Sequence, residues 1–458
     1  MTNFPTSRDE FYRLRDDRTD RYIANREYQN ANCLVTIDSD FVNTFTGQVT
    51  LLTTCNLLSR WCRNVLIVIP SVSTHKSLAA KIPLRNFILE QMLDADPFGN
   101  FRIEETAQNL SAQIQIHIGP NFEQRSDRYV LVNASGWYAS VSTSKVIDLK
   151  ASIDKNCIGA IAAACFGVSQ VFKDAIGYPS ELNIAEGIFD LFTLERVEHQ
   201  DQCFQYPENV DVGRVLMVGS GSVGSAAAYA LRTIGAMMDL TIIDHDNVKI
   251  ENFNRSPVFG RSNYQHNKAK AVAQFLAGSS IKAHDFDGSW NDFIEKEGDL
   301  KNRFDVWLPL ANEQNVRWSM QNNIPPLMIH ASTTQNWGVN YGRHIPTRED
   351  CLVDRFPVES LDEYLNCSTG EVKIKDVTVD AALPFLSFFA GLLVAADLVR
   401  LGLDNYPQIP NFALVDFGGT LDQIQRFSKK PRVNCLCRTQ VGLFERFNGE
   451  TRYYNTHS

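Results

Sequence analysis

The stretch RVLMVGSGSVGSAAAYALRTIGAMMDLTIIDHD, residues 214–246, decides the fold of this chain. It begins with an apolar run (214–221), continues with a small-residue run of helical periodicity (222–236) and ends in a second apolar run (239–246). Two apolar runs joined by a helix predict a right-handed parallel crossover of strand, helix and strand. We therefore expect a parallel α/β sheet in this part of the chain.

Three glycines stand at the predicted turn from strand to helix. Gly219, Gly221 and Gly224 have the G-x-G-x-x-G spacing, which lets the backbone and the first helical amides approach phosphate oxygens. Asp244 ends the next strand, where a carboxylate can accept hydrogen bonds from ribose hydroxyls. Dehydrogenases, flavoproteins and methyltransferases share the glycine spacing, but in this context it predicts a nucleotide site.

The first half of the chain repeats this order of elements. CLVTI (33–37) and VLIVIP (65–70) are predicted strands on either side of a helical run at 47–61. Each half also contains a late helix rich in small apolar residues, at 156–177 and 380–403. An internal duplication is the simplest explanation.

The predicted fold class is α/β, with two tandem Rossmann-like doubly wound domains at 1–204 and 205–458. In the N-terminal domain, the turn after the first strand reads DSDFVNTFTGQ (38–48) and lacks close-set glycines. A backbone without them cannot approach phosphate closely. We expect only the second domain to bind a nucleotide.

The composition excludes several classes of function. The chain has 458 residues and a formal net charge of -9 with interspersed charges, which argues against a nucleic-acid-binding surface. The polar N-terminus does not resemble a secretory signal peptide, and the longest apolar run, 381–396, is short for a membrane span. Ten cysteines without a signal sequence indicate a reducing compartment. We expect a cytoplasmic protein with no nucleic-acid and no membrane partner.

A dense polar cluster follows the second strand. Asp246, Asn252, Asn254 and Arg255 come first, and Lys268 follows in HNKAKAVA. A dinucleotide site leaves this cluster unexplained. An arginine and a lysine beyond a ribose-binding aspartate can neutralise a third phosphate and stabilise the charge on departing pyrophosphate. The cluster therefore predicts ATP-dependent adenylation of a carboxylate.

The segment IDHDNVKIENFNRS (243–256) has the pattern D-x-D-x-V-x-x-x-N-x-x-R. Together with GSGSVG (219–224) and the downstream lysine, it resembles the E1-like superfamily of ubiquitin-activating, ThiF, MoeB and HesA adenylating enzymes. A two-half acidic chain of this size is similar to the bacterial E1-like proteins of ubiquitin-like conjugation operons, including anti-phage operons. The resemblance implies a pseudo-dimer with an inactive N-terminal domain and an active C-terminal one that uses ATP and Mg²⁺.

The resemblance also implies roles for single residues. It places glycines under the ATP, an aspartate on the ribose and further polar residues around the phosphates, with Arg255 and Lys268 acting in catalysis. The nucleotide-binding set is Gly219, Gly221, Gly224, Asp244, Asp246, Asn252, Arg255, Lys268 and Asn312. In the family an Asp-Asn pair holds magnesium, but here Ala311 and Asn312 stand in its place. Three explanations remain open: Glu313 replaces the carboxylate, the alignment slips by a residue, or the metal dependence differs.

Adenylation sites of this family also receive an arginine from the partner half, near its N-terminus. FYRLRDDRTDRY offers Arg13, Arg15, Arg18 and Arg21. The spacing to the first strand favours Arg13 or Arg15. A solvated charged helix explains each of these arginines equally well.

The crossover segment, about 343–379, contains the candidate catalytic cysteine. Cys367, in NCSTGEV, matches the thioester-forming cysteine of the family, whose thiolate attacks the acyl adenylate. A mobile loop is needed to bring it to the adenylate. We expect His344, near the start of this segment, to be a surface residue without a catalytic role.

Three further cysteines resemble the family's structural zinc site. Cys351 matches its first cysteine, Asp354 stands in place of the second, and Cys435 and Cys437 form a C-x-C. Three interpretations remain open. Zinc is held by the three cysteines and Asp354, or the thiols are free, or Cys367 is the fourth zinc ligand and no thioester catalyst remains.

The sequence therefore predicts an E1-like activating enzyme. It would adenylate the C-terminal carboxylate of a ubiquitin-like protein, take it as a thioester on Cys367 and pass it to an E2-like protein. The alternatives are adenylation for sulfur transfer or peptide modification, without a stable thioester, and a non-catalytic nucleotide-binding scaffold, which Ala311 favours. An NAD-dependent oxidoreductase fits least, because Arg255 and Lys268 would then have no task. We expect a monomer with an internal pseudo-dimer, or a homodimer.

Overall fold

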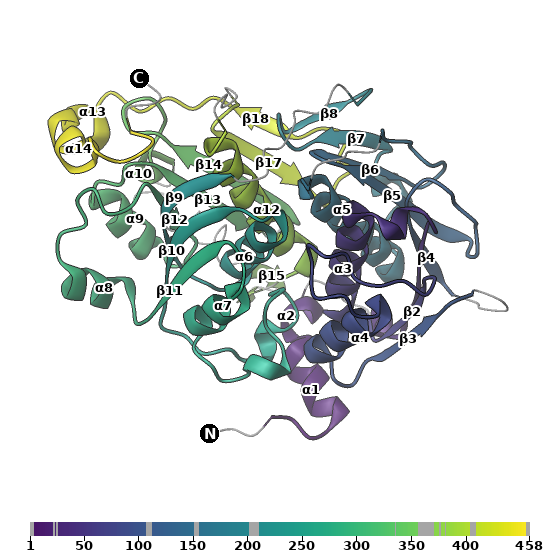
Figure 1. The fold of residues 1–458 in the computed structure, drawn as a ribbon. Coiled ribbons are helices and arrows are strands. Elements are labelled where there is room, and N and C mark those ends of the chain that lie inside the picture. The colour runs from purple at the N-terminus through teal and green to yellow at the C-terminus, as the bar shows by residue number, and fades with distance from the viewer. Residues whose placement is uncertain are drawn as a thin grey trace.

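The computed structural model describes residues 4–21, 23, 26–106, 112–150, 155–200, 210–334, 336–355, 371–374, 377–380, 382–403 and 409–454. Within these ranges it contains two eight-stranded sheets and a separate two-stranded hairpin. Figure 1 shows the purple-to-blue half of the chain beside the teal-to-yellow half, each built around one of the large sheets.

The first half contains the first large sheet and the helices that cover it. Its described helices and strands are α1 (Arg8–Arg15), α2 (Asp17–Asp20), β1 (Asn32–Ile37), α3 (Phe45–Ser59), β2 (Asn64–Val68), α4 (Leu84–Ala95), β3 (Asn100–Glu104), β4 (Ile114–Ile118), β5 (Arg128–Ser135), β6 (Tyr138–Ser142), α5 (Ile158–Ile176), β7 (Gly187–Asp190) and β8 (Glu195–Val197). Short 3₁₀ turns lie at Arg26–Asn30 (η1), Phe41–Asn43 (η2) and Ser180–Leu182 (η3).

The second half contains the second large sheet and the hairpin. Its described elements are β9 (Asp211–Val218), α6 (Ser222–Ile234), β10 (Met237–Asp244), α7 (Lys268–Leu276), β11 (Ile281–Asp287), α8 (Trp290–Glu297), β12 (Val306–Pro309), α9 (Gln314–Asn322), β13 (Met328–Thr333), β14 (Gly338–His344), α10 (Leu352–Arg355), β15 (Glu371–Ile374), β16 (Val377–Asp380), α12 (Pro384–Leu401), β17 (Phe412–Asp416), β18 (Gln425–Phe427), α13 (Leu436–Thr439) and α14 (Val441–Asn448). Two 3₁₀ turns, η4 (Ile250–Asn252) and η5 (Arg261–Asn263), lie between β10 and α7.

The two large sheets have the same topology. The first has the order β3-β2-β1-β4-β5-β6-β7-β8 and the second β11-β10-β9-β12-β13-β14-β17-β18. In each order the first five strands are parallel and the last three antiparallel. The predicted fold class of two Rossmann-like α/β domains is confirmed, and the shared order agrees with an internal duplication.

Two apolar helices join the halves into one core. α5 and α12 are apolar on all sides, so each must be covered all round, and they pack against each other. The rings of Phe166 on α5 and Phe389 on α12 lie 5.3 Å apart, centroid to centroid. α12 also approaches α6 so closely that a Cβ on Gly391 would lie 2.4 Å from the amide nitrogen of Ala227. The core cluster therefore contains residues of both halves.

The same two helices are long and apolar enough to cross a membrane, judged by length and composition. In the fold their apolar windows are 89% and 100% buried. Core helices of this kind pass such a test because they are enclosed by protein on every side.

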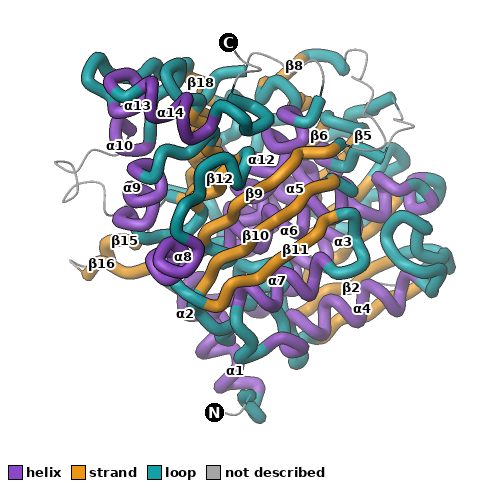
Figure 2. Tube along the Cα trace, turned by 60° about the vertical axis from the view of Figure 1, so that its left-hand side comes forward, coloured by secondary structure: helices purple, strands orange, loops and turns teal. Residues whose placement is uncertain are grey.

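The N-terminal helices α1 and α2 lie at the junction of the halves, and α1 lies below α2 in the views of Figure 1 and Figure 2. The ring of Phe11 lies 6.2 Å from that of Phe253 in the second half. The side-chain amide of Asn254 donates to the Thr19 hydroxyl at 3.1 Å, and this hydroxyl donates to the carbonyl of Ala382 at 3.3 Å. The start of the chain is thereby attached to the second half.

Candidate adenylation site

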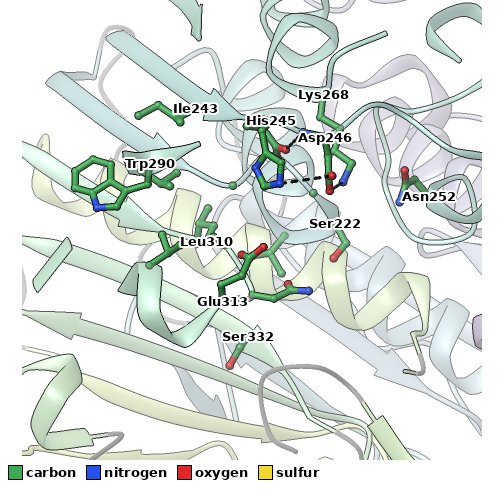
Figure 3. A pocket seen from close by; sticks show the side chains of 18 of the residues that line it. Ser222, Ile243, His245, Asp246, Asn252, Lys268, Trp290, Leu310, Glu313 and Ser332 are labelled. Atoms are coloured by element: carbon green, nitrogen blue, oxygen red, sulfur yellow. Dashed lines mark hydrogen bonds and ion pairs between the residues drawn. The ribbon is translucent and has the colours of Figure 1, made fainter. Parts of the chain in front are cut away.

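A pocket of about 390 Å³ lies at the carboxyl ends of β9, β10, β12 and β13. Ligands of parallel α/β sheets bind at this edge. In Figure 3, Lys268, Asp246 and His245 lie on one side of the pocket and Glu313 and Ser332 lie across from them. Eight of the nine residues predicted to bind the nucleotide line the pocket: Gly219, Gly221, Asp244, Asp246, Asn252, Arg255, Lys268 and Asn312.

The glycine loop between β9 and α6 forms the floor of the pocket. Gly219 has φ +95°, and a Cβ there would lie 2.4 Å from the amide nitrogen of Ala311. Gly224 lies beneath the loop, where a Cβ would meet the carbonyl of Gly219 at 2.2 Å. A Cβ on Gly221 would meet no atom within 4 Å. The loop is packed tightly on its protein side and open on the side where phosphate would bind.

Asp244 ends β10 and is positioned by the glycine loop. One carboxylate oxygen accepts hydrogen bonds from the amide and the hydroxyl of Ser220, at 2.7 and 3.1 Å, and the other accepts from the amide of Asp246 at 3.0 Å. Each carboxylate oxygen has two lone pairs, so the oxygen that accepts from Asp246 can accept one further hydrogen bond. This arrangement suits acceptance of a hydrogen bond from a ribose hydroxyl.

Asp246 and Lys268 form an ion pair of 2.7 Å on one wall, drawn as a dashed line in Figure 3. Burial alone would raise the pKa of Asp246, but the hydrogen bond and the positive charge of Lys268 lower it. The wall therefore carries a carboxylate and an ammonium at neutral pH. The ammonium is held where it can exchange this partner for a phosphate oxygen.

The next wall is the loop that contains Asn252 and Arg255. Asn252 is buried, and its side-chain oxygen accepts from the amide of Lys249 at 2.8 Å. Arg255 is 8% exposed and donates to the side chain of Asn254 at 3.0 Å and to the carbonyl of Glu251. Because its side chain is fixed by these bonds, Arg255 presents a pre-oriented positive charge to the pocket.

The segment after β12 differs from the family pattern. The backbone of Ala311 packs against Gly219, whereas Asn312 and Glu313 are exposed and line the pocket. Arg317, on α9, also lines the pocket; it is 3% exposed and donates to the carbonyl of Ala311 at 2.9 Å. Burial lowers the pKa of Arg317 to about 10, so it remains a cation at neutral pH. Sequence reasoning offered Glu313 only as one of three explanations for the missing carboxylate, and it did not name Arg317.

The expectation that Arg13 or Arg15 reaches the site is wrong. Arg15 is fully buried and its guanidinium pairs with Asp16 at 2.6 Å and with Asp96 at 2.5 Å. Arg13 is exposed and does not line the pocket. The arginine that lines it is Arg18, 3.6 Å from Glu251. The chain turns at Asp16, between α1 and α2, and this turn directs Arg18 toward the second half.

Sequence reasoning also missed other pocket residues, among them Trp290, Ser332 and Ser387. Trp290 begins α8 after β11, Ser332 is the next-to-last residue of β13, and Ser387 lies in the first turn of α12. Trp290 is 2% exposed and its indole nitrogen donates to the hydroxyl of Ser319 at 2.9 Å. The carboxyl ends of β11 and β13 were the signal that could have identified the first two, because ligand contacts gather at that edge.

In the first half, the corresponding turn after β1 is filled by its own chain. A Cβ on Gly47 would lie 1.9 Å from the carbonyl of Phe41. Thr44 caps α3 by accepting from the amide of Gly47 at 2.9 Å, and Asp38 accepts from the amide of Phe41 at 2.7 Å. The amides that would hold phosphate are therefore already bound or covered, in agreement with the expectation of one nucleotide site.

Three predicted cysteines, from two segments that are far apart in the sequence, come together in the fold. The sulfur atoms of Cys351 and Cys435 are 2.8 Å apart and those of Cys435 and Cys437 are 3.1 Å apart. A carboxylate oxygen of Asp354 lies 3.5 Å from the Cys351 sulfur, and the amide of Thr347 donates to the Cys437 sulfur at 3.3 Å. Hydrogen bonds from the thiols of Cys351 and Cys435 lower the pKa of Cys437. Three thiols and one carboxylate suit the tetrahedral coordination of zinc.

His344 is not a surface residue, contrary to expectation. It ends β14, is 1% exposed, and its Nδ1 lies 3.2 Å from the carbonyl oxygens of both Glu349 and Asp350. Burial lowers the pKa of His344, so the ring is neutral at physiological pH. Its role is to hold the turn that leads into the cysteine cluster.

Cys367 lies outside the described residues, so its role as the thioester-forming cysteine remains a prediction. The described residues on either side of its segment show where that segment begins and ends. Cys351 and Asp354 lie just before this segment, and Ala382 and Ser387, which follow it, line the pocket. The segment that contains Cys367 therefore begins at the cysteine cluster, and the chain after it returns to the pocket.

Comparison with known protein families gives one match in each half. The ThiF family matches residues 205–438, just over half of the chain, and the BilD N-terminal domain matches residues 32–182. No curated protein matches this sequence.

Among solved structures, E. coli MccB resembles this chain in its fold. MccB with succinimide is 17% identical over 49% of this chain and 66% of MccB, with a TM-score of 0.39. MccB with ATP is 17% identical over 50% of this chain and 67% of MccB, with a TM-score of 0.39. MccB with AMPCPP and MccA is 18% identical over 49% and 66%, also with a TM-score of 0.39. Such a distant likeness does not bear on the substrate.

The family match and the pocket lead to the same identification. The matched range contains the glycine loop, Asp244, Arg255 and Lys268, all of which lie in or under one pocket. Those residues are the ones that an adenylating enzyme needs around ATP. The chain belongs to the ThiF family and thus to the E1-like superfamily of adenylating enzymes.

Proposed function

We propose that this protein activates the C-terminal carboxylate of a ubiquitin-like protein with ATP and passes it, through a thioester on Cys367, to an E2-like protein. One observation supports the activation step most directly. The pocket combines the open glycine loop with Asp244, Arg255 and Lys268 of the second half and Arg18 of the first half. A ribose acceptor surrounded by three cations suits a nucleoside triphosphate whose pyrophosphate leaves.

In the proposed first step, a carboxylate oxygen of the substrate protein attacks the α-phosphorus of ATP. The bond from that phosphorus to the bridging oxygen breaks, and pyrophosphate leaves with the electron pair. The products are an acyl adenylate and pyrophosphate. Arg255, Lys268 and Arg18 stabilise the negative charge that gathers on the leaving group, and Asp244 orients the ribose.

Magnesium would assist at the phosphates. The pocket contains carboxylates that suit Mg²⁺, which prefers oxygen ligands: Asp244, Asp246, Glu251 and Glu313. Glu313 lies closest in sequence to the position of the family's metal-binding pair and is exposed. We assign the missing carboxylate to Glu313, and magnesium would supply Lewis-acid stabilisation of the phosphate charge.

In the proposed second step, the Cys367 thiolate attacks the acyl carbon of the adenylate. A thioester forms, the bond to the phosphate oxygen breaks, and AMP leaves. The cysteine cluster lies just before the loop, and zinc on Cys351, Cys435, Cys437 and Asp354 would fix that end of it. The thioester would then pass to the cysteine of an E2-like protein by thiol exchange.

ATP:pyrophosphate exchange with ubiquitin-like proteins, followed by a non-reducing gel, tests this proposal. Wild type and Cys367→Ala should both exchange pyrophosphate, and only wild type should form an adduct that a thiol reductant removes. Exchange without any such adduct would contradict the thioester and favour adenylation for sulfur transfer or peptide modification. ATP binding without exchange would contradict the enzyme and favour a nucleotide-binding scaffold.

A further inference from the structure

A second cavity lies between the halves, away from the adenylation pocket. Its volume is about 510 Å³, within the range typical of small-molecule sites. Helices α3 and α4 of the first half line it together with α6, α7 and the loop at 257–263 of the second half. Neither the family match nor the proposed reaction assigns a role to this cavity.

The cavity has apolar walls and an excess of positive charge. Leu52, Phe87 and Phe275 are among its apolar residues, and Arg60 and Arg232 are its two cations. Among the described residues, no carboxylate lies within ion-pair distance of either guanidinium. An anion in the cavity would therefore meet cations that lack a charged partner.

The cavity also contains one carboxylate, Asp94, which is already engaged. Its oxygens accept from the amide and the hydroxyl of Ser262 at 2.8 and 3.0 Å. Arg232 donates to the carbonyl of Phe275 and lies 4.6 Å from the centre of that ring. The chemistry of the walls thus fits a ligand with an anionic group and an apolar body.

Arg60 connects this cavity with the loop of the adenylation site. Its guanidinium is 2% exposed and donates to the carbonyls of Phe253, Pro257 and Phe259, at 2.9, 2.8 and 2.5 Å. In the sequence, Phe253 precedes Arg255 and the other two residues follow it, and Arg255 lines the adenylation pocket. One side chain of the first half therefore holds the backbone that positions a phosphate-binding residue of the second.

We propose that the cavity between α3, α4, α6 and α7 binds an anionic small molecule with an apolar body, and that its occupancy is coupled to ATP binding through Arg60. A ligand anion that draws the guanidinium toward itself weakens its bonds to the three carbonyls. The loop that contains Arg255 then shifts its conformational equilibrium. Such coupling is reciprocal, because two ligands of one protein change each other's affinity by the same factor.

The probe for this site is 8-anilinonaphthalene-1-sulfonate, a sulfonate with an aromatic body, used with the full chain and without a ubiquitin-like protein. We expect saturable binding with a fluorescence increase. Arg232→Gln should weaken binding at least about tenfold, because it removes a charge-assisted hydrogen bond to the sulfonate. Gln274→Trp, which adds bulk at the cavity wall, should weaken it as well.

Two matched variants control for general effects. Arg303→Gln removes an arginine that pairs with Glu297 outside the cavity, and Gln124→Trp adds an indole at an exposed position of the first half. Both should bind the probe as wild type does. Equal binding by all four variants would show adsorption to other apolar surface and overturn the proposed site.

Calorimetric titration of ATP and Mg²⁺, with and without saturating probe, tests the coupling. We expect the Kd of ATP to change at least about threefold and the Kd of the probe to change by the same factor when ATP is present. Arg60→Lys, which keeps the charge but cannot reach three carbonyls at once, should abolish this mutual effect. Unchanged ATP affinity in wild type with the probe bound would overturn the coupling. These readouts need no pyrophosphate exchange, so they are independent of the proposed reaction.

Discussion

At the scale of single residues, Arg18 lines the adenylation pocket, although the sequence spacing favoured Arg13 or Arg15. We expect Arg18→Ala to lower kcat/KM for ATP:pyrophosphate exchange about 10–100-fold, because a charge-assisted hydrogen bond to phosphate contributes about 1.5–3 kcal/mol. Arg13→Ala, at an exposed position outside the pocket, is the matched control and should keep wild-type exchange. Wild-type exchange by Arg18→Ala together with a loss of exchange in Arg13→Ala would contradict this assignment and favour Arg13 as the arginine that acts on ATP.

Arg15→Ala should act on stability. Its guanidinium is fully buried between Asp16 and Asp96, so removal leaves the buried Asp96 carboxylate without its ion-pair partner and leaves Asp16 paired with Arg63 alone. Breaking such a pair costs about 3–5 kcal/mol. Urea unfolding should show this loss in Arg15→Ala and little change in Arg18→Ala. Equal stability of the two variants would contradict the assignment of a structural role to Arg15.

The predicted residues that line the pocket come mostly from one continuous stretch of sequence. Gly219 follows β9, Asp244 ends the neighbouring strand β10 and Arg255 lies in the loop after β10, so they meet at one edge of the sheet. Arg18 could not be placed in this way, because the turn at Asp16 that redirects the chain is held by Arg63, 47 positions further along the chain. His344 was misplaced for a related reason, since its burial depends on the turn at Glu349 that folds over it.

At the scale of elements, Asp305 joins β9, β12 and the C-terminal segment. Its carboxylate accepts from the amide, Nε and Nη2 of Arg214, at 2.8, 3.0 and 2.9 Å, and from the amide of Arg452 at 2.8 Å. Burial alone would raise the pKa of Asp305, but these hydrogen bonds lower it.

A lowered folded-state pKa gives Asp305 a definite pH dependence. Its contribution to stability is fully present above the unfolded pKa of about 3.9 and is lost as the pH falls through the lower folded pKa. We expect Asp305→Asn to have a lower Tm than wild type at pH 7, with a smaller difference at pH 3. A difference that stays constant between these pH values would contradict an ionised Asp305. Glu297→Gln, which removes a partly exposed ion pair with Arg303, should show little difference at either pH.

The cysteine cluster also connects two elements that are far apart in the sequence, because Cys351 directly precedes α10 and Cys435 directly precedes α13. If it holds zinc as proposed, wild type should contain about one zinc ion per chain. Cys435→Ser should lose it and should increase protease cleavage around α10, while Cys55→Ser, buried elsewhere, should retain it. Zinc content by atomic absorption is the measurement. Metal-free wild-type protein with intact α10 would favour ordinary thiols.

At the scale of the whole molecule, the duplication was predictable because the periodic apolar runs occur twice in the same order. The way in which the halves join was not. The sequence shows α5 and α12 only as apolar helices, and nothing in their periodicity indicates that each covers the other. The extent of the shared core follows from contacts such as those of Phe166 with both Phe389 and Phe417.

A shared core predicts that the two halves unfold together. Hydrogen exchange measured by mass spectrometry reports on each half separately, and we expect both to lose protection at the same urea concentration. Phe389→Ala removes a ring packed 5.3 Å from Phe166 and 5.2 Å from Phe417, which should cost about 3–5 kcal/mol. Because α12 packs on elements of both halves, this one change in the second half should lower the midpoint of the first half equally. Leu93→Ala, at a side chain 42% exposed, should leave both midpoints unchanged. Loss of protection in the second half alone would show that the interface between α5 and α12 joins two independently stable domains.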